Sequence, residues 1–387
     1  MPNNTKQPLV VVAMSGGVDS SVAALLLKQS GYEVIGITMR LASADDTSIS
    51  SSTNQCCGVE DVEDARRVCQ IIGSPHYYLN FEKEFQQHVI DYFCSEYQKG
   101  RTPHPCIACN DRIKFDFLLE RAKFMGADYI ATGHYARIKK EGSQYKLIKG
   151  IDPSKDQSYV LFNLKQSQLQ TLLLPVGKYS KADIRQLALE SNLPVADKPD
   201  SQEICFIPSN NYKEYIQDKL NKTSKGAIVN TKGQRLGTHN GIEFYTIGQR
   251  RGLGIELKDK AFVTKIDHLT NTITIGNDDD LMCSTAWVSN LNYISGIKPE
   301  GPFTATVKIR YKSPPSTAVV QPNGAGALIT FSRAQRAITP GQALVIYQND
   351  QVLGGGFIDG TNIPETNTET RDPQEQSTAT SLELKHA

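Results

Sequence analysis

Apolar and polar positions along the first 200 residues follow two periods in turn, one typical of strands and one of helices. Short apolar runs that predict buried strands are Leu9–Ala13, Glu33–Met39, His76–Leu79 and Tyr129–Thr132. Stretches with helical spacing of apolar residues lie between them: Ser20–Gln29, Val59–Ile72, Phe81–Tyr97 and Asp111–Phe124. This series predicts an α/β fold with a mostly parallel sheet covered by helices, in which ligands bind at the carboxyl ends of the strands.

The pattern changes after about Pro208, where short β-rich runs separated by glycine and asparagine replace the helical spacing. These runs are Ala227–Val229, Glu243–Ile247, Phe262–Ile266, Thr272–Ile275, Phe303–Ile309, Thr317–Val320, Gly326–Phe331 and Ala343–Tyr347. They predict small β-rich domains, including a C-terminal β-barrel. We therefore expect an N-terminal α/β domain over residues 1–208, a central small β-rich domain over 209–282, the barrel over 283–362 and a disordered tail over 363–387.

Length and composition are those of a globular protein with about two or three domains. The chain has 387 residues, of which 39% are hydrophobic. No apolar run approaches the roughly 18 residues of a membrane span, and the short polar segment Met1–Gln7 predicts neither signal nor transit peptide. We therefore expect a cytoplasmic protein without a membrane partner. The polar, serine-rich stretch Ala42–Gln55 predicts a mobile loop.

The net charge of +1 says little by itself about binding to nucleic acid. Basic residues do gather locally, and each cluster is either a solvated surface or a contact for a polyanion. The clusters are Lys139, Lys140, Lys146, Lys149 and Lys155; Arg250 and Arg251; and Lys308, Arg310 and Lys312.

The strongest chemical signal lies between the first predicted strand and the first predicted helix. Ser15-Gly16-Gly17-Val18-Asp19-Ser20 places a glycine pair where backbone N–H groups can converge on a phosphate at the positive end of a helix. No lysine follows the glycines, and the GxxxxGK[ST] pattern of the commoner phosphate loop does not occur in the chain. The loop predicts a nucleotide site that is poorly suited to stabilising a departing γ-phosphate. Asp19 is either a Mg²⁺ ligand or a cap of the following helix.

Two cysteines have surroundings that suit reactive thiols. Cys109 precedes Asn110 and Asp111, which are good N-cap residues, so we expect it at a helix N-terminus, where the helix dipole lowers the thiol pKa. Cys205 lies in a polar run that leads into an apolar one, unlike a cysteine buried in a core.

The other cysteines and one histidine have plainer interpretations. Structural zinc on four thiols is an alternative, although adjacent cysteines fit tetrahedral geometry badly; its ligands would be Cys56, Cys57, Cys106 and Cys109. Cys69, Cys94 and Cys283 are expected to be packed thiols. His134, at the end of a predicted strand, is either catalytic or satisfied by local hydrogen bonds.

The loop, the Cys106-x-x-Cys109-Asn110 segment and Cys205 together resemble the tRNA-specific 2-thiouridylase family of PP-loop ATP pyrophosphatases. The resemblance runs from about Val10 to Phe357 and includes further segments in the same order: Glu60–Val68, Thr132–Arg137, Lys155–Tyr159, Asp200–Phe206, Tyr245–Gly252 and Thr339–Ala343. It implies a Rossmann-like PP-loop domain followed by β-rich domains, and a tRNA-uridine 2-sulfurtransferase that acts on the wobble uridine of lysine, glutamate and glutamine tRNAs.

The resemblance also implies the reaction. The C2 oxygen of the uracil would attack the α-phosphate of ATP, with Mg²⁺ accompanying the ATP, and pyrophosphate would leave. A persulfide on Cys205, loaded by a sulfur-relay protein or a cysteine desulfurase, would then deliver sulfur to C2. Cys109 would be the partner thiol, which forms a transient disulfide with Cys205 or releases sulfide from its persulfide.

Binding residues are implied in the same way. Those for ATP are Ala13, Met14, Ser15, Gly16, Gly17, Val18, Asp19, Ser20, Met39 and Gly133. Those for tRNA are His104, Pro105, Cys106, Lys155, Asp156, Gln157, Arg310 and Tyr311. The chain departs from the family at the target-base segment, where some members have Asn-Pro-Asp. An aspartate that assists proton transfer is therefore missing, and either His104 or no residue replaces it.

Two functions of other classes compete with the thiouridylase. A PP-loop enzyme that adenylates a small molecule, such as a GMP-synthetase-like amidotransferase, leaves Cys205 and the β-rich half unexplained. A nucleotide-gated RNA-binding protein needs no pair of well-placed cysteines.

Overall fold

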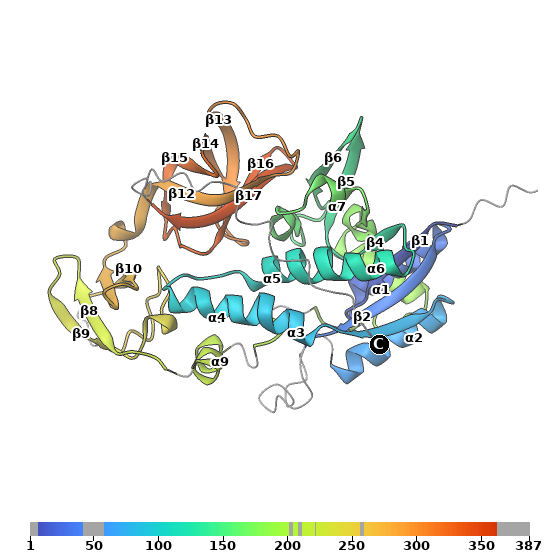
Figure 1. Cartoon of the computed structure of the whole chain (residues 1–387), viewed down its shortest axis with the longest axis horizontal. Helices are drawn as coiled ribbons and strands as arrows, with labels where there is room; N and C mark the ends of the chain where they lie inside the picture. The colour runs from blue at the N-terminus through green and yellow to red at the C-terminus, as the bar shows by residue number, and fades with distance from the viewer. Residues whose placement is uncertain are drawn as a thin grey trace, which may run out of the picture.

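A computed structural model of the chain describes residues 7–41, 58–200, 204–207, 211–220, 222–255 and 259–361. Those residues form a parallel sheet with helices, a small β-sheet and a barrel (Figure 1). The predicted loop Ala42–Gln55 and the predicted tail 363–387 lie outside the described residues. Within them, no helix combines the length and apolar character needed to cross a membrane.

The N-terminal sheet contains five parallel strands in the order β3-β2-β1-β4-β7. Their bounds are Leu9–Ala13 (β1), Glu33–Arg40 (β2), His76–Asn80 (β3), Tyr129–Ala131 (β4) and Leu172–Leu173 (β7). The structure confirms the parallel sheet and the four predicted strands in it. β1 is buried throughout because alternate residues enter two cores, with Val10 and Val12 on one face and Val11 and Ala13 on the other.

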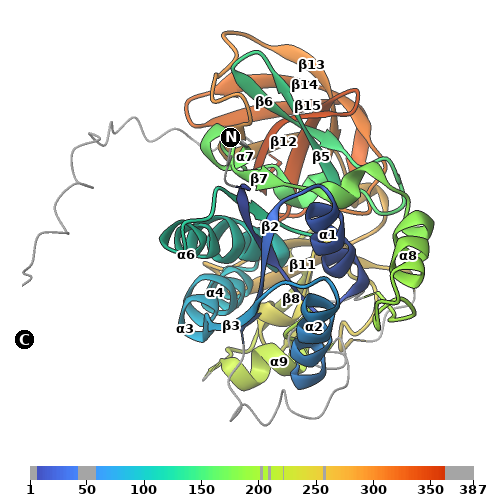
Figure 2. The ribbon, with the colours of Figure 1, turned by 90° about the vertical axis from the view of Figure 1, so that its right-hand side faces the viewer.

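Helices cover both faces of this sheet, as Figure 2 shows. One face carries α1 (Val18–Gln29), α2 (Val59–Ile71) and α8 (Lys181–Glu190). The other carries α3 (Glu82–Phe85), a π-helical turn (Gln86–Ile90), α4 (Asp91–Gln98), α5 (Pro105–Ala108), a second π-helical stretch (Cys109–Leu118) and α6 (Leu119–Phe124). Further helices elsewhere in the chain include α7 (Gln166–Leu169) and α9 (Tyr212–Lys219). The Rossmann-like class of the N-terminal part is thus confirmed.

The helix predicted to begin at Asp111 begins earlier. α5 starts at Pro105 with His104 as its N-cap residue and continues into the π-helical stretch, so Asn110 and Asp111 lie inside the helical run. Proline suits the first helical position because its fixed φ is already helical and its missing N–H would have no partner there. The prediction that Asn110 and Asp111 cap this helix was therefore wrong.

The small sheet has the order β10-β11-β8-β9. Its strands are Gly226–Asn230 (β8), Arg235–His239 (β9), Phe262–Asp267 (β10) and Thr272–Gly276 (β11). The strand predicted over Glu243–Ile247 is wrong, because Ile242–Phe244 forms a 3₁₀ turn. That turn lets Ile242 and Tyr245, which are three positions apart, face the same small core.

The C-terminal strands close into a barrel, as predicted. They are Met282–Tyr293 (β12), Phe303–Lys308 (β13), Ser316–Asn323 (β14), Gly326–Arg336 (β15), Ala343–Gln348 (β16) and Gln351–Gly360 (β17). β12 pairs with both β15 and β17, which completes the ring β12-β15-β14-β13-β16-β17. Closure leaves no unpaired edge among these strands.

A hairpin from the N-terminal part of the chain joins this barrel. Its strands, β5 (Ala136–Glu141) and β6 (Gln144–Lys149), were missed at the sequence level, where their lysines indicated only a basic cluster. β6 pairs with β17, and the side chains of Leu147 and Val352 in that pair are fully buried. Sheet pairing therefore ties residues before Pro208 to the barrel.

Truncating the hairpin's buried contact should destabilise the barrel side of the molecule. Leu147→Ala leaves a cavity beside Val352, and we expect it to cost about 2–5 kcal/mol of unfolding free energy. The fluorescence of Trp287, the only tryptophan and part of β12, followed through a urea titration measures the change. Leu269→Ala, at a position 85% exposed, is the matched control; equal midpoints for the two variants would contradict the prediction.

Candidate functional site

The loop between β1 and α1 exposes the backbone donors of a helix N-terminus. Gly17 is the N-cap residue of α1, and no side chain within the described ranges caps the helix. The amide groups of the first turn are thus oriented for an anion. Ser20 Oγ stabilises the loop by accepting from the Ser15 N–H at 3.2 Å and donating to the Gly17 carbonyl at 3.1 Å.

Close backbone packing explains the glycines around this loop. Gly16 has a φ of +71°, and a Cβ there would lie 2.4 Å from the Asp61 carbonyl oxygen in α2. A Cβ on Gly133, just after β4, would lie 2.6 Å from the Ser20 nitrogen. The residues predicted for ATP, which are Ala13–Ser20, Met39 and Gly133, therefore gather at the carboxyl ends of β1, β2 and β4.

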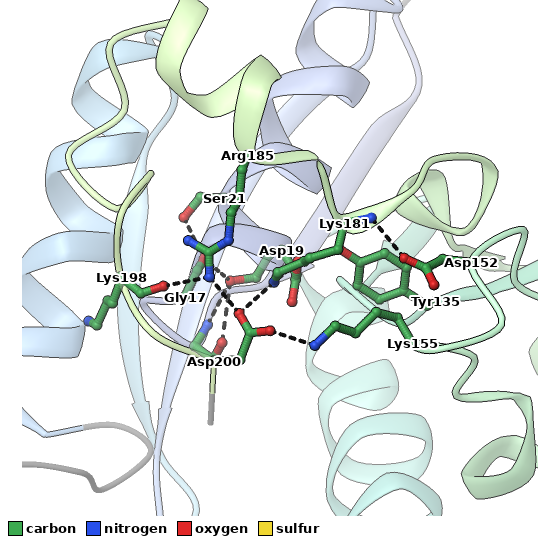
Figure 3. A network of polar contacts seen from close by, with 12 residues as sticks. Gly17, Asp19, Ser21, Tyr135, Asp152, Lys155, Lys181, Arg185, Lys198 and Asp200 are labelled. Atoms are coloured by element: carbon green, nitrogen blue, oxygen red, sulfur yellow. Dashed lines mark hydrogen bonds and ion pairs between the residues drawn. The ribbon is translucent and has the colours of Figure 1, made fainter. Parts of the chain in front are cut away.

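Asp19 joins the loop to two distant side chains (Figure 3). Its Oδ1 accepts from the Tyr135 hydroxyl at 2.6 Å and from Lys181 Nζ at 2.7 Å. Asp19 therefore does not cap α1, which removes one of its two interpretations. Burial and then the Asp19 carboxylate raise the pKa of Tyr135, so this hydroxyl stays protonated and donates.

Asp200 forms ion pairs with three basic side chains of this site. It accepts from Lys155 Nζ at 2.7 Å, Lys181 Nζ at 2.8 Å and Arg185 at 2.9 Å (Figure 3). Burial alone would raise the pKa of its carboxyl, but hydrogen bonds from Lys155 and Lys181 outweigh burial and lower the pKa to about 2. Sequence reasoning missed Lys181, Arg185 and the role of Asp200. The only local signal was the Ser180-x-x-Asp183 capping box, which marks the start of α8.

Cys109 lies one turn inside its helix rather than at the N-terminus. Its N–H already points to the carbonyls of Pro105 and Cys106, so the predicted activation by a free helix terminus is wrong. Both Cys109 and Cys205 are half-buried and pack against the same hydrophobic core. Phe206 anchors the Cys205 segment there, with edge-to-face ring contacts to other buried aromatics.

The remaining thiols match their plainer interpretation. Cys69 and Cys94 are buried, and burial raises the pKa of each to about 11. Cys283 packs against the barrel core. Cys56 and Cys57, needed for the zinc alternative, lie outside the described residues. The part of the chain that the structure describes contains no group of three or more histidine, cysteine or acidic side chains able to hold a metal.

His134 has the local hydrogen bond that one of its two interpretations required. Its Nδ1 lies 2.7 Å from Thr132 Oγ1, and the side chain is buried. Burial lowers its pKa, so the imidazole is neutral.

The three segments predicted to contact tRNA meet between the N-terminal domain and the barrel. The Tyr311 hydroxyl donates to the Asp156 carbonyl at 3.2 Å, and the rings of His104 and Tyr311 lie 6.3 Å apart. Lys308 Nζ lies 5.9 Å from the Tyr311 ring. Pro105 and Cys106 belong to the same helical turn, and Cys106 is exposed.

The other predicted tRNA contacts bind protein groups in this structure. Gln157 Oε1 accepts from the Tyr135 N–H at 2.9 Å, and the Arg310 guanidinium donates to the carbonyls of Arg336 and Ala337. Lys155 is paired with Asp200. Lys155–Gln157 thus connects the nucleotide loop to the barrel.

A Rossmann-like sheet with a lysine-free glycine loop, followed by two β-rich domains, defines a nucleotide-binding protein of the HUP class. The profile of the tRNA methyl transferase HUP domain matches residues 8–209, that of the tRNA methyl transferase PRC-barrel domain matches 213–277, and that of the aminomethyltransferase beta-barrel domain matches 284–358.

Curated relatives give the family. A protein of Clostridium perfringens named tRNA-specific 2-thiouridylase MnmA is 48% identical over 352 residues, which is 90% of this chain and 98% of the relative. A protein of Clostridioides difficile with the same name is 49% identical over 354 residues, with the same two coverages. The chain belongs to the tRNA-specific 2-thiouridylase family.

The half-buried His104, whose Nδ1 is fully buried, should make stability depend on pH. Burial lowers its pKa to about 4, and its Nδ1 has no hydrogen-bond partner among the described residues. In the unfolded chain His104 becomes protonated below about pH 6.5, whereas in the folded chain it stays neutral down to about pH 4. The unfolding free energy therefore falls as the pH falls through that window.

Replacing the imidazole should remove this dependence. Between about pH 7 and pH 5, urea titrations should show the wild type losing up to about 2 kcal/mol more than His104→Asn. His268→Gln, at an exposed position, should behave as the wild type. Parallel pH profiles for His104→Asn and the wild type would refute the assignment of a neutral His104.

Proposed function

We propose that this chain catalyses ATP-dependent 2-thiolation of the wobble uridine in tRNA. Family membership over 90% of the chain supports tRNA as the substrate and thiolation as the chemistry. The structural observation that carries the proposal is the placement of a lysine-free glycine loop and of two half-buried thiols, Cys109 and Cys205, on one α/β domain. The small-molecule and RNA-binding alternatives give those thiols no role.

In the first stage ATP binds at the glycine loop. The amide groups of the loop and the neighbouring cations interact favourably with the phosphates of ATP. The uracil C2 oxygen attacks the α-phosphorus, a new P–O bond forms, and the bond to pyrophosphate breaks. AMP is then attached to the base, and C2, formerly an unreactive carbonyl carbon, carries a good leaving group. Mg²⁺ bound with ATP would neutralise phosphate charge, and Asp19 is a carboxylate within the loop itself that could hold it.

In the second stage the terminal sulfur of a Cys205 persulfide attacks C2, and AMP leaves. The Cys109 thiolate then attacks the Cys205 sulfur, so that the sulfur stays on the base and a Cys109–Cys205 disulfide forms. Alternatively, Cys109 attacks the persulfide first, releasing sulfide that attacks C2. Both routes end in a disulfide that a cellular thiol must reduce. A sulfur-relay protein or a cysteine desulfurase would reload Cys205.

The tRNA lies across the N-terminal domain and the β domains in this proposal. An enzyme acting on one base takes it out of its stack, which is least costly in a single-stranded anticodon loop. His104 and Tyr311, which come from the helix of Cys109 and from the barrel, are near each other and suit contacts to that base. Lysine, glutamate and glutamine tRNAs are the proposed substrates, and the cytoplasm the proposed location.

The two thiols should be dispensable for adenylation and essential for sulfur transfer. In a strain lacking this gene, expression of Cys109→Ser or Cys205→Ser should leave 2-thiouridine in digested bulk tRNA at least about 100-fold below wild-type complementation. Both purified variants should still release pyrophosphate from ATP when tRNA is present. Cys283→Ser, which changes a thiol packed on the barrel, is the control and should restore modification. Unchanged 2-thiouridine in the deletion strain would sink the proposal.

We infer that His104 takes over the proton transfer that the resemblance assigns to an aspartate in some members of the family. Its imidazole is neutral and therefore has a nitrogen lone pair that can accept a proton from the uracil, and its lowered pKa of about 4 makes it a weak base, comparable to the aspartate it replaces. We expect His104→Ala to slow thiolation in vitro by about 100-fold, while the exposed His268→Ala leaves the rate unchanged. Full thiolation by His104→Ala would show that no residue replaces the aspartate.

A further inference from the structure

Lys181 places a cation next to the glycine loop, whose own sequence contains no lysine. Its Nζ lies 2.7 Å from Asp19 Oδ1, although 162 positions separate the two residues in sequence. The same Nζ lies 2.8 Å from Asp200 Oδ1, and the side chain is 12% exposed (Figure 3). A lysine far along the chain is therefore held at the start of α1.

The backbone around Lys181 fixes its position independently of those ion pairs. Lys181 is the first residue of α8, whose capping box joins Ser180 and Asp183 in both directions. Its N–H donates to Asp152 Oδ2 at 3.0 Å. α8 shares a buried core with α1, so the ammonium group is positioned by helix packing and by caps.

Three basic side chains of this cluster converge on one carboxylate. Lys155, Lys181 and Arg185 carry three positive charges, and all three side chains contact the single carboxylate of Asp200. Asp19 supplies a second carboxylate to Lys181, and Asp152 Oδ2 accepts from the Lys181 N–H, so the cluster contains three cations and three carboxylates. The Asp200 carboxylate accepts hydrogen bonds from the same kinds of groups that would bind a phosphate oxygen. It carries less negative charge than a polyphosphate does.

We infer that Lys181 is the cation that binds the β- and γ-phosphates of the nucleotide at this loop, and that Asp200 is the counter-ion it exchanges for them. This inference rests on the proposed function. Because the uncapped first turn of α1 adjoins Asp19, phosphates bound there come within reach of Lys181. The ammonium group then stabilises the negative charge that develops on the departing pyrophosphate, a task that loop lysines perform in the commoner phosphate loops.

Binding of ligands with different phosphate content tests the inference. Isothermal titration with ATP, AMP and inorganic pyrophosphate, each with the same magnesium chloride, should show Lys181→Gln weakening ATP and pyrophosphate by about 10- to 100-fold. AMP affinity should stay within about twofold, since AMP lacks the phosphates that Lys181 contacts. Lys178→Gln, at an exposed position in the preceding turn, should bind all three ligands as the wild type does.

Two further variants separate a phosphate contact from a structural role. Asp200→Asn removes the competing carboxylate, so ATP should bind more tightly than to the wild type, in the opposite direction to Lys181→Gln. Lys181→Arg should recover most of the ATP affinity. If Lys181→Gln loses affinity equally for AMP and ATP, or loses no affinity for ATP, Lys181 does not contact the phosphates. If Asp200→Asn binds ATP more weakly than the wild type does, Asp200 is not the counter-ion that the phosphates replace.

Experiments that contradict the proposed function would give a different pattern of results. If the wild type binds neither ATP nor pyrophosphate, the nucleotide site itself is wrong, and the role of Lys181 falls with it. If 2-thiouridine persists in the deletion strain while Lys181→Gln still loses ATP selectively, the thiolation proposal fails and the role of Lys181 stands.

Discussion

One hydrophobic core, shared by the N-terminal domain and the barrel, holds the rest of the structure together. Residues of the parallel sheet and its helices pack in the same cluster as Tyr159, Tyr347 and Val352. The Tyr159 hydroxyl donates to the Ala343 carbonyl at 2.8 Å inside that core. Because this packing is continuous, the barrel is fixed relative to the helix of Cys109, and His104 and Tyr311 come together across the boundary.

Ion pairs determine the arrangement of the charged cluster in the same domain. A loop without a lysine can still bind polyphosphate when helix packing brings in a cation from elsewhere, and Lys181 is brought in by α8. Asp200 lies five positions before Cys205 in the sequence, so the ion pairs of the proposed nucleotide site and the proposed sulfur-carrying thiol come from the same short stretch of chain.

Local patterns predicted most of the fold where local sequence determines structure. β1 and its glycine loop were predictable because a buried strand must be apolar and a loop pressed against α2 must contain glycine at Gly16. The start at Pro105 was missed, although proline at a first helical position is a local signal. No local pattern could have revealed Lys181 beside Asp19 or β6 beside β17, because both pairings depend on how distant elements pack. Predicted roles for Cys109 and Cys205 came from family resemblance, and they remain proposals.

The pairing of β6 with β17 has a consequence for synthesis on the ribosome. β6 ends at Lys149 and β17 begins at Gln351, so at about 5–20 residues per second the hairpin leaves the ribosome roughly 10 to 40 s before its partner strand exists. During that interval Leu147, fully buried in the finished protein, has no barrel to cover it. Nascent chains of this protein therefore carry an unpaired strand edge, a target for chaperones, until the last barrel strand is made.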